Sequence, residues 1–206
     1  DKALRYDLTV PLARYVAQNQ NNLIFPYRRY QIQPVWRADR PQYGRFQEFY
    51  QCDADIVGER SLWQEVEVLS LYDTVFSDLC IKGAVLKLNH RKILLGIASL
   101  MEVESNLTDL TLILDKFDKI GRSGVLDELK SKNFSKNSIE TLDNFLSIKG
   151  SLKDQLDKLK ELLSTHEAAS EGIREMEFIF SQLDKNPLKS VGFNLDLTLA
   201  RGLHYY

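Results

Sequence analysis

Side chains in a β-strand alternate between two faces, and residues 45–58 show such an alternation clearly. One face receives mostly polar residues, namely Arg45, Gln47, Phe49, Gln51, Asp53 and Asp55. The opposite face receives mostly apolar residues, namely Phe46, Tyr50, Cys52, Ala54 and Ile56. The pattern predicts a strand with one packing face and one polar face. The polar face is either solvated or the floor of a ligand-binding site.

Another alternating run comes just before it. Tyr30, Ile32 and Trp36 share one parity, while glutamines occupy the other, and Pro34 indicates a sheet edge or a bulge. The connecting segment "ADRPQYG" holds a proline and a glycine, as loops commonly do. The two runs therefore predict an antiparallel hairpin at about residues 25–58, with a loop longer than a tight two-residue turn.

The neighbouring segments predict helices and one further strand. Thr9 is placed to cap a helix near the start of the chain, and Pro11 suits the first turn of that helix. Apolar residues at spacings of three and four predict a helix over residues 61–79. Residues 83–90 indicate a strand, and residues 91–101 indicate another helix.

From about residue 107 to residue 187 the pattern becomes that of charged, amphipathic helices. In "SLKDQLDKLKELL", Ser151 and Asp154 predict a capping box, and leucines form an apolar stripe. Residues 191–206 return to a strand pattern. We therefore predict an α+β fold in three parts: residues 1–106, a helical insertion at 107–185, and residues 186–206.

Composition narrows the classes of function. With 44% hydrophobic and 27% charged residues, the 206-residue chain is typical of a soluble globular protein. A net charge of −2 gives no general attraction to nucleic acid, and no apolar run is long enough to span a membrane. Because the chain opens at Asp1 inside a patterned segment, we expect it to be a piece of a longer protein.

Several kinds of site are absent from the sequence. It has neither a P-loop nor a dinucleotide-binding glycine motif. Cys52 and Cys80 lack metal-type spacing, and we expect both to be reduced thiols of an intracellular protein. The three histidines lie far apart in the sequence and do not show the spacing of zinc ligands: His90, His166 and His204. We predict no metal site and no tightly bound cofactor.

The arginines are the remaining candidates for a ligand-binding site. Residues 25–50 hold five arginines, no lysine and two acids, interleaved with eight aromatic residues. Guanidinium groups match phosphate oxygens in pairs, and flat side chains stack on bases, so this mixture suits a nucleotide. A hairpin whose arginines merely extend into solvent fits the composition equally well.

Taken together, four stretches resemble the histidyl-tRNA synthetases, a family of class II aminoacyl-tRNA synthetases. They are "LRYDLTVPLARYVA", "VWRADRPQYGRFQEFYQCDADIVG", "DKFDKIG" and "LARGLHYY". The strand-loop-strand around "RADRPQYGR", residues 37–45, resembles motif 2 of that class, and "ARGLHYY" resembles a signature of the histidine enzymes. The resemblance implies an antiparallel sheet of about six strands with flanking helices. It also implies that histidine and ATP, with Mg²⁺, form histidyl-adenylate before the histidyl group passes to tRNA(His).

The resemblance also implies roles for individual residues. Arg37 and Arg201 would contact the α-phosphate of ATP and act catalytically, and Arg45 would lie nearer the distal phosphates. Asp7 and Gln51 would hold the α-amino group, and Asp55 would accept from the imidazole N–H. The full set implied to bind histidine is Asp7, Thr9, Gln51, Asp55, Tyr205 and Tyr206. Strand parity agrees, because Gln51 and Asp55 share the polar face with Arg45.

The chain departs from the family pattern in places. Asp7 and Asp55 stand where some members have glutamate, and His204 stands where aspartate is frequent. Three family features have no counterpart in this sequence. They are the dimer-forming motif 1, the arginine of motif 3 and an anticodon-binding domain. The resemblance implies a cytoplasmic homodimer for the full-length protein.

Two other classes remain open. One is the synthetase-like regulatory subunit of ATP phosphoribosyltransferase, a non-catalytic binding protein of histidine biosynthesis. The other is a synthetase-like domain that senses uncharged tRNA. Both would be expected to lose part of the catalytic set, whereas Arg37, Gln51 and Arg201 are all present here, so the sequence favours the enzyme.

Overall fold

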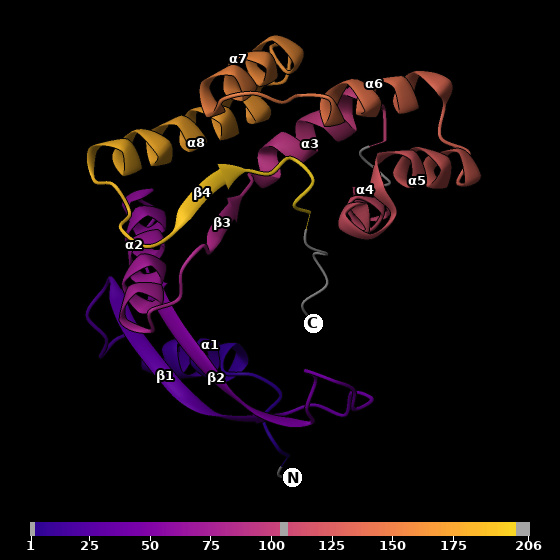
Figure 1. Cartoon of the computed structure of the whole chain (residues 1–206). Coiled ribbons are helices and arrows are strands. Elements are labelled where there is room, and N and C mark those ends of the chain that lie inside the picture. The colour runs from indigo at the N-terminus through magenta and orange to yellow at the C-terminus, as the bar shows by residue number, and fades with distance from the viewer. Residues whose placement is uncertain (1–2, 104–106, 201–206) are drawn as a thin grey trace. The chain divides into compact units, whose positions relative to one another are not determined.

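The chain contains two compact units, residues 1–64 and residues 65–206. The computed structural model describes residues 3–103 and 107–200, and Figure 1 shows the elements of both units. The first unit holds a β-hairpin and one helix, and the second holds mostly helices with one pair of strands. Helices and strands thus form the predicted α+β fold.

The first unit is built on the predicted hairpin. Strand β1 (Tyr27–Trp36) pairs antiparallel with β2 (Glu48–Val57), in a register that puts Arg29 opposite Asp55. Strand β2 begins three residues later than the alternation suggested, because residues 37–47 form the connecting loop. Pro34 is tolerated inside β1, where its carbonyl accepts a hydrogen bond from Nε of Arg5 at 2.9 Å.

Helix α1 (Thr9–Asn19) begins one residue after its N-cap, Leu8. The prediction that Thr9 caps the helix is therefore wrong, since Thr9 is already the first helical residue. Asp7 supplies the missing acceptor instead: its Oδ1 accepts from the N–H of Val10 at 3.3 Å. An aspartate just before a helix satisfies a free N–H as a serine or threonine cap does.

The two faces of the hairpin are not buried in the way that the sequence predicted. Residues 6–15 lie against the polar face, where the Leu8 carbonyl contacts Arg29 and the ring of Tyr15 lies 6.3 Å from that of Tyr27. On the apolar face Tyr30 is 81% exposed and Tyr50 is 70% exposed. Among the described residues, the polar face is therefore the better-buried one. The expectation that the apolar face is the packing face is wrong for these residues.

The second unit begins with α2 (Trp63–Asp78), β3 (Val85–Leu88) and α3 (Arg91–Leu100). Five further helices and a short strand follow in the described part of the chain: α4 (Leu107–Leu114), α5 (Phe117–Ser131), α6 (Lys136–Leu146), α7 (Leu152–Leu162), α8 (Glu167–Lys185) and β4 (Gly192–Leu195). The predicted capping box of Ser151 and Asp154 is present at the start of α7.

Strands β3 and β4 pair in parallel, with Leu88 opposite Leu195. The described residues thus form two separate strand pairs, one of them parallel, rather than a single antiparallel sheet of about six strands. A parallel pair needs a long crossover, and the helices between residues 91 and 185 supply it.

The core of the second unit is centred on α3. Ile93 and Ile97 are fully buried, and α8 crosses α3 closely enough that a Cβ on Gly96 would lie 2.5 Å from that of Ala169. Helices α4 to α8 contribute to the same apolar cluster as α3. The structure therefore groups these helices with their neighbours, and the division at residues 107 and 185 stays a prediction. No helix of the described residues is long and apolar enough to cross a membrane.

Strand β4 ends earlier than predicted, at Leu195. The carboxylate of Asp196 accepts hydrogen bonds from both the N–H and the hydroxyl of Thr198, which turns the chain away from the sheet. Upstream of β4, the buried carboxylate of Asp73 on α2 accepts from three successive N–H groups at 2.7 to 3.1 Å, those of Lys189, Ser190 and Val191. These bonds hold the start of β4 against α2.

Candidate functional site

The polar face of the hairpin carries a ladder of paired side chains. The register places Arg29 opposite Asp55, with Gln31 opposite Asp53 and Gln33 opposite Gln51. Opposite residues of an antiparallel pair stand close enough for their side chains to interact. In the first pair, Nη2 of Arg29 lies 2.9 Å from Oδ2 of Asp55.

Hydrogen bonds also run along each strand of this ladder. On β1, Nη1 of Arg29 donates to Oε1 of Gln31, and Nε2 of Gln31 donates to Oε1 of Gln33 at 2.9 Å. On β2, Nε2 of Gln51 donates to Oδ1 of Asp53 at 3.3 Å. The side chains of this face are therefore held in defined orientations.

Asp7 joins the same face from the segment before α1. Asp7 is only 2% exposed, and the adjacent Leu8 carbonyl accepts from Nη2 of Arg29 at 3.2 Å. Thr9, by contrast, is exposed on α1. Of the residues predicted to bind histidine, Asp7, Gln51 and Asp55 are thus brought to one face, and the side chain of Thr9 is largely in solvent.

Three carboxylates gather on this face. Burial raises the pKa of Asp53, the negative charges of Asp55 and Asp7 raise it further, and the positive charge of Arg29 opposes them. The face is therefore acidic, with one buried cation among its carboxylates. Such a surface favours a ligand that carries an ammonium group and donates hydrogen bonds.

Some polar atoms of this face are buried without a hydrogen-bond partner among the described residues: Oε1 of Gln51, Nε of Arg29 and Oδ2 of Asp55. The last of these is close to Arg29, but that contact is an ion pair without hydrogen-bond alignment. Buried polar atoms are nearly always paired in native proteins. The acceptors on Gln51 and Asp55 are consequently available to N–H groups of a ligand.

Arg37 lies at the loop end of the same face. Its guanidinium stacks 4.5 Å from the ring of Tyr6 and 5.0 Å from that of Phe49, and its Nε donates to the Tyr6 carbonyl at 3.4 Å. Phe49 has the same strand parity as Gln51, so Arg37 is directed to the polar face. Contact with these two rings sets the orientation of the Arg37 guanidinium.

Arg45 belongs to the loop rather than to β2, and strand parity therefore does not place it. Its N–H donates to the carbonyl of Gln42 at 2.8 Å, and its side chain is exposed. Arg201, Tyr205 and Tyr206 lie outside the described residues. Arg29 was missed from the sequence, although its parity matches Gln31, because only the register shows that it faces Asp55.

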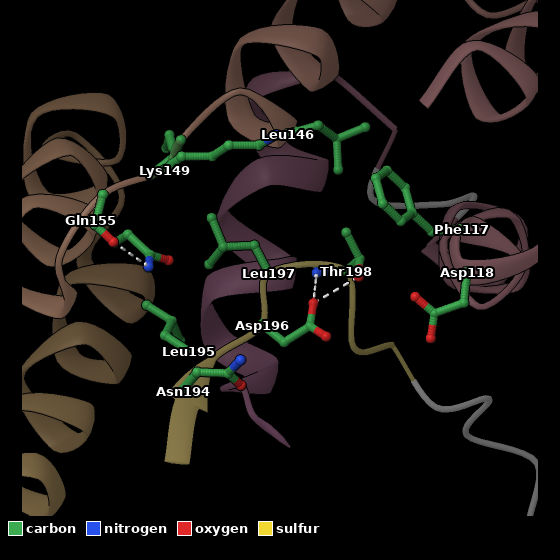
Figure 2. A pocket seen from close by; sticks show the side chains of 12 residues that line it. Phe117, Asp118, Leu146, Lys149, Gln155, Asn194, Leu195, Asp196, Leu197 and Thr198 are labelled. Carbon is green, nitrogen blue, oxygen red and sulfur yellow. Dashed lines mark hydrogen bonds between the residues drawn. The ribbon is translucent and has the colours of Figure 1, made fainter. Parts of the chain in front are cut away.

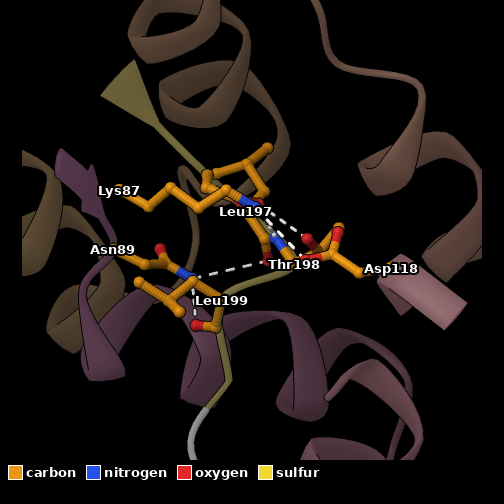
Figure 3. A network of polar contacts seen from close by, with 7 residues as sticks. Lys87, Asn89, Asp118, Leu197, Thr198 and Leu199 are labelled. Carbon is orange, nitrogen blue, oxygen red and sulfur yellow. Dashed lines mark hydrogen bonds and ion pairs between the residues drawn. The ribbon is translucent and has the colours of Figure 1, made fainter. Parts of the chain in front are cut away.

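Another polar cluster, in the other unit, holds the segment that leads toward the "ARGLHYY" stretch (Figure 3). Lys87 on β3 lies 2.9 Å from Asp196 and 3.3 Å from Asp118, and Asn89 donates to the carbonyls of Leu197 and Leu199. Burial raises the pKa of Asp196, but hydrogen bonds from Thr198 and Lys87 outweigh it and keep that pKa below its usual value. Asp196 is therefore a structural anion.

Next to this cluster lies a cavity of about 360 Å³ (Figure 2). Its walls come from the end of β4, the start of α5 and the connection between α6 and α7, and include Phe117, Leu146, Lys149 and Leu197. Asp196 and Thr198 bond to one another at its edge. In the described part of the chain, no group of three or more His, Cys, Asp and Glu side chains is arranged to hold a metal ion.

Comparison with known proteins gives consistent results along the whole chain. A family model described as histidyl-tRNA synthetase matches residues 2–206. The chain is 50% identical to the histidine–tRNA ligases of Christiangramia forsetii and of Flavobacterium johnsoniae. Both matches cover 100% of this chain, but only 45% and 43% of the respective relatives. The chain thus spans less than half the length of these curated relatives.

Solved structures agree on the fold. A histidyl-tRNA synthetase from a Nostoc species is 33% identical and superposes with a TM-score of 0.88, over 99% of this chain and 47% of that one. A protein from Bacillus halodurans, described as an ATP phosphoribosyltransferase regulatory subunit/histidyl-tRNA synthetase, is 23% identical with a TM-score of 0.79. The match covers 98% of this chain and 51% of that protein. At that identity the likeness to the Bacillus halodurans protein concerns the fold alone.

Proposed function

Because the chain belongs to the histidyl-tRNA synthetase family, we propose that it forms part of a histidine–tRNA ligase. The enzyme activates histidine with ATP to histidyl-adenylate and transfers the histidyl group to tRNA(His). The observation that carries the proposal is the polar hairpin face, which brings Asp7, Gln51, Asp55 and Arg37 together within a chain of this family. Fold likeness alone would carry less weight, because one fold hosts many functions.

Histidine binds through the acidic part of this face. Asp7 and Gln51 hold the α-amino group, and Thr9, exposed at the start of α1 in this structure, belongs to the same proposed set. Asp55 and Tyr206 recognise the imidazole, and Tyr205 belongs to the same histidine-binding set. A buried carboxylate that accepts from a ring N–H rejects side chains that lack such a donor far better than an apolar contact does, because the acceptor is otherwise left unpaired. Two acceptors support this assignment: Oε1 of Gln51, which is buried without a hydrogen-bond partner among the described residues, and Oδ2 of Asp55, whose contact with Arg29 is an ion pair.

ATP, with its Mg²⁺, binds as a substrate through the arginines. Arg37 and Arg201 contact the α-phosphate, where negative charge grows as the histidine carboxylate attacks, and Arg45 contacts the distal phosphates. Fixed cations aimed at developing charge lower the barrier because they need no reorganisation during the reaction. The stacked position of Arg37 between Tyr6 and Phe49 supports its role.

The full-length protein acts as a homodimer in the cytoplasm. The helices of residues 107–185 contact the acceptor arm of the tRNA. These helices carry charges of both signs, and their exposed lysines are the side chains that would meet the tRNA phosphates: Lys119, Lys136, Lys153 and Lys158.

The proposal is tested by ATP–pyrophosphate exchange with the full-length protein, comparing histidine with each other amino acid. We expect exchange with histidine only. Histidine binding without any exchange would overturn the enzyme assignment and favour the regulatory subunit of ATP phosphoribosyltransferase. The presence of Arg37 and Gln51 at matching positions argues for the enzyme.

A further inference from the structure

Arg29 has no role in the proposed function, yet it is the most deeply set cation of the hairpin face. Its side chain is 9% exposed, although it lies on a strand of only a two-stranded hairpin. A guanidinium stays charged at any working pH, so burying it is costly unless anions and acceptors surround it. Its position therefore calls for a specific set of partners.

The partners of Arg29 come from three segments. Nη2 contacts Oδ2 of Asp55 on β2 at 2.9 Å and donates to the carbonyl of Leu8 at 3.2 Å. Nη1 donates to Gln31 on its own strand. The Leu8 carbonyl directly follows Asp7, so one guanidinium joins the two segments that carry Asp7 and Asp55.

The contact with Arg29 restrains the Asp55 carboxylate, but it does not form an aligned hydrogen bond to Oδ2. Oδ2 lies at ion-pair distance from Nη2, but it has no aligned hydrogen bond among the described residues. Arg29 also places a positive charge beside Asp55, on a face where the carboxylate of Asp53 feels the negative charges of both Asp55 and Asp7. Without this cation, Asp55 would face its acidic neighbours unbalanced and would be free to turn away.

We propose that Arg29 is a positioning residue for histidine, which holds the Asp55 carboxylate oriented toward the imidazole N–H and ties the Asp7 segment to the same face. This inference rests on the proposed function, because it takes Asp55 and Asp7 as histidine contacts. Arg29 itself touches neither histidine nor ATP. Its effect is therefore on the affinity for histidine rather than on the chemical step.

The test measures histidine KM, ATP KM and kcat in pyrophosphate exchange with the full-length protein carrying Arg29→Met. Methionine keeps an unbranched stem but has neither the charge nor the donors. We expect histidine KM to rise ~10- to 100-fold, as when a hydrogen-bonded charge partner is lost, with ATP KM changed less than ~3-fold. Arg28→Met is the matched control, since Arg28 is the neighbouring exposed arginine on the opposite face, and it should leave histidine KM unchanged.

A double variant separates positioning from mere stability. If Arg29 acts through Asp55, adding Arg29→Met to Asp55→Asn should raise histidine KM far less than the product of the two single effects. Arg29→Lys keeps a charge but cannot reach both partners, so its histidine KM should lie between wild type and Arg29→Met. If Arg29→Met does not fold, the same comparison is made between Arg29→Lys and the control.

Two results overturn the inference. One is an unchanged histidine KM in a folded Arg29 variant, with only the melting temperature lowered. The other is an equal rise in histidine KM and ATP KM. Either result, obtained while the wild-type protein shows histidine-dependent exchange, leaves the proposed function standing. Absence of exchange in the wild type would instead overturn the proposed function, on which this inference depends.

Discussion

At the scale of single residues, the hairpin face combines three carboxylates with one buried arginine. Asp53 has a raised pKa because burial and its acidic neighbours disfavour its charge, whereas Asp55 has an arginine directly opposite. Neighbouring carboxylates of one strand thus sit in different environments. Asp55 rather than Asp53 therefore has a cation directly across the hairpin, which is why the prediction for histidine binding is made at Asp55.

Asp55→Ala in the full-length protein should therefore raise histidine KM more than ATP KM. Leaving the imidazole donor unpaired costs ~1–3 kcal/mol, which corresponds to a rise of ~10- to 100-fold. Steady-state pyrophosphate exchange measures both constants. Cys52→Ala is the control, because Cys52 is exposed and has the opposite strand parity. A changed ATP KM with an unchanged histidine KM would remove Asp55 from the amino-acid pocket.

Arg201→Ala should lower kcat for adenylate formation by ~10²-fold or more, with a much smaller change in histidine KM. The reason is that a cation at the α-phosphate is used more in the transition state than in the ground state. Arg201→Lys should restore activity only in part, since a point charge does not replace the two-pronged contact. An intact kcat together with a lowered melting temperature would mean that Arg201 contributes to stability rather than to catalysis.

At the scale of elements, two kinds of contact organise the second unit. One is a set of hydrogen bonds from backbone N–H groups to a carboxylate, and the other is the close packing of two helices. Asp73 on α2 accepts from three N–H groups before β4, and Gly96 on α3 lets α8 approach. Both contacts join segments that are distant in sequence. Each can be tested by a single substitution.

Asp73→Asn should lower the melting temperature at pH 7. Hydrogen bonds from the N–H groups of Lys189, Ser190 and Val191 lower the pKa of Asp73, so its charge stabilises the fold above the ordinary aspartate pKa. That contribution is lost as pH falls through the lowered pKa. The difference between wild type and variant should hence shrink below about pH 4. Thermal unfolding at several pH values measures it, with exposed Asp78→Asn as control; a difference that is constant with pH would contradict the charge explanation.

Gly96→Ala should destabilise the second unit by ~1–3 kcal/mol, because the new Cβ would lie 2.5 Å from that of Ala169. Urea unfolding of the variant measures the loss. Adding Ala169→Gly removes the opposing methyl group and should recover part of it, despite the helix cost of glycine. Strictly additive effects of the two substitutions would show that the helices do not meet at these residues.

At the scale of the whole molecule, the chain consists of two units, and the helices proposed to contact tRNA share their core with α3. Deleting residues 107–185 would therefore expose buried surface of the second unit. Loss of tRNA charging after such a deletion would not distinguish lost contact from lost stability. Surface substitutions test the contact without this difficulty.

The triple variant Lys119→Glu, Lys136→Glu, Lys153→Glu should reduce charging of tRNA(His) and leave pyrophosphate exchange unchanged. These lysines are exposed on separate helices, and each attracts phosphate only through its charge. Aminoacylation and exchange are measured on the same preparation, together with the melting temperature. Charging at the wild-type rate would exclude these three lysines from the tRNA contact.

The sequence by itself determined the elements and the parity of the hairpin. A period of two placed Gln51 and Asp55 on one face, and spacings of three and four marked helices such as α2 and α3. The capping box of Ser151 and Asp154 was equally predictable. These features depend on side chains that are close in sequence, so a single segment contains all the information they need.

Only the tertiary structure decided which segments meet. A loop of about ten residues does not set the register of a hairpin, so the pairing of Arg29 with Asp55 was not predictable. The same holds for the burial of the polar face under residues 6–15, and for the parallel pairing of β3 with β4 across the intervening helices. Each of these contacts depends on how distant segments pack together, and local periodicity carries no information about that packing.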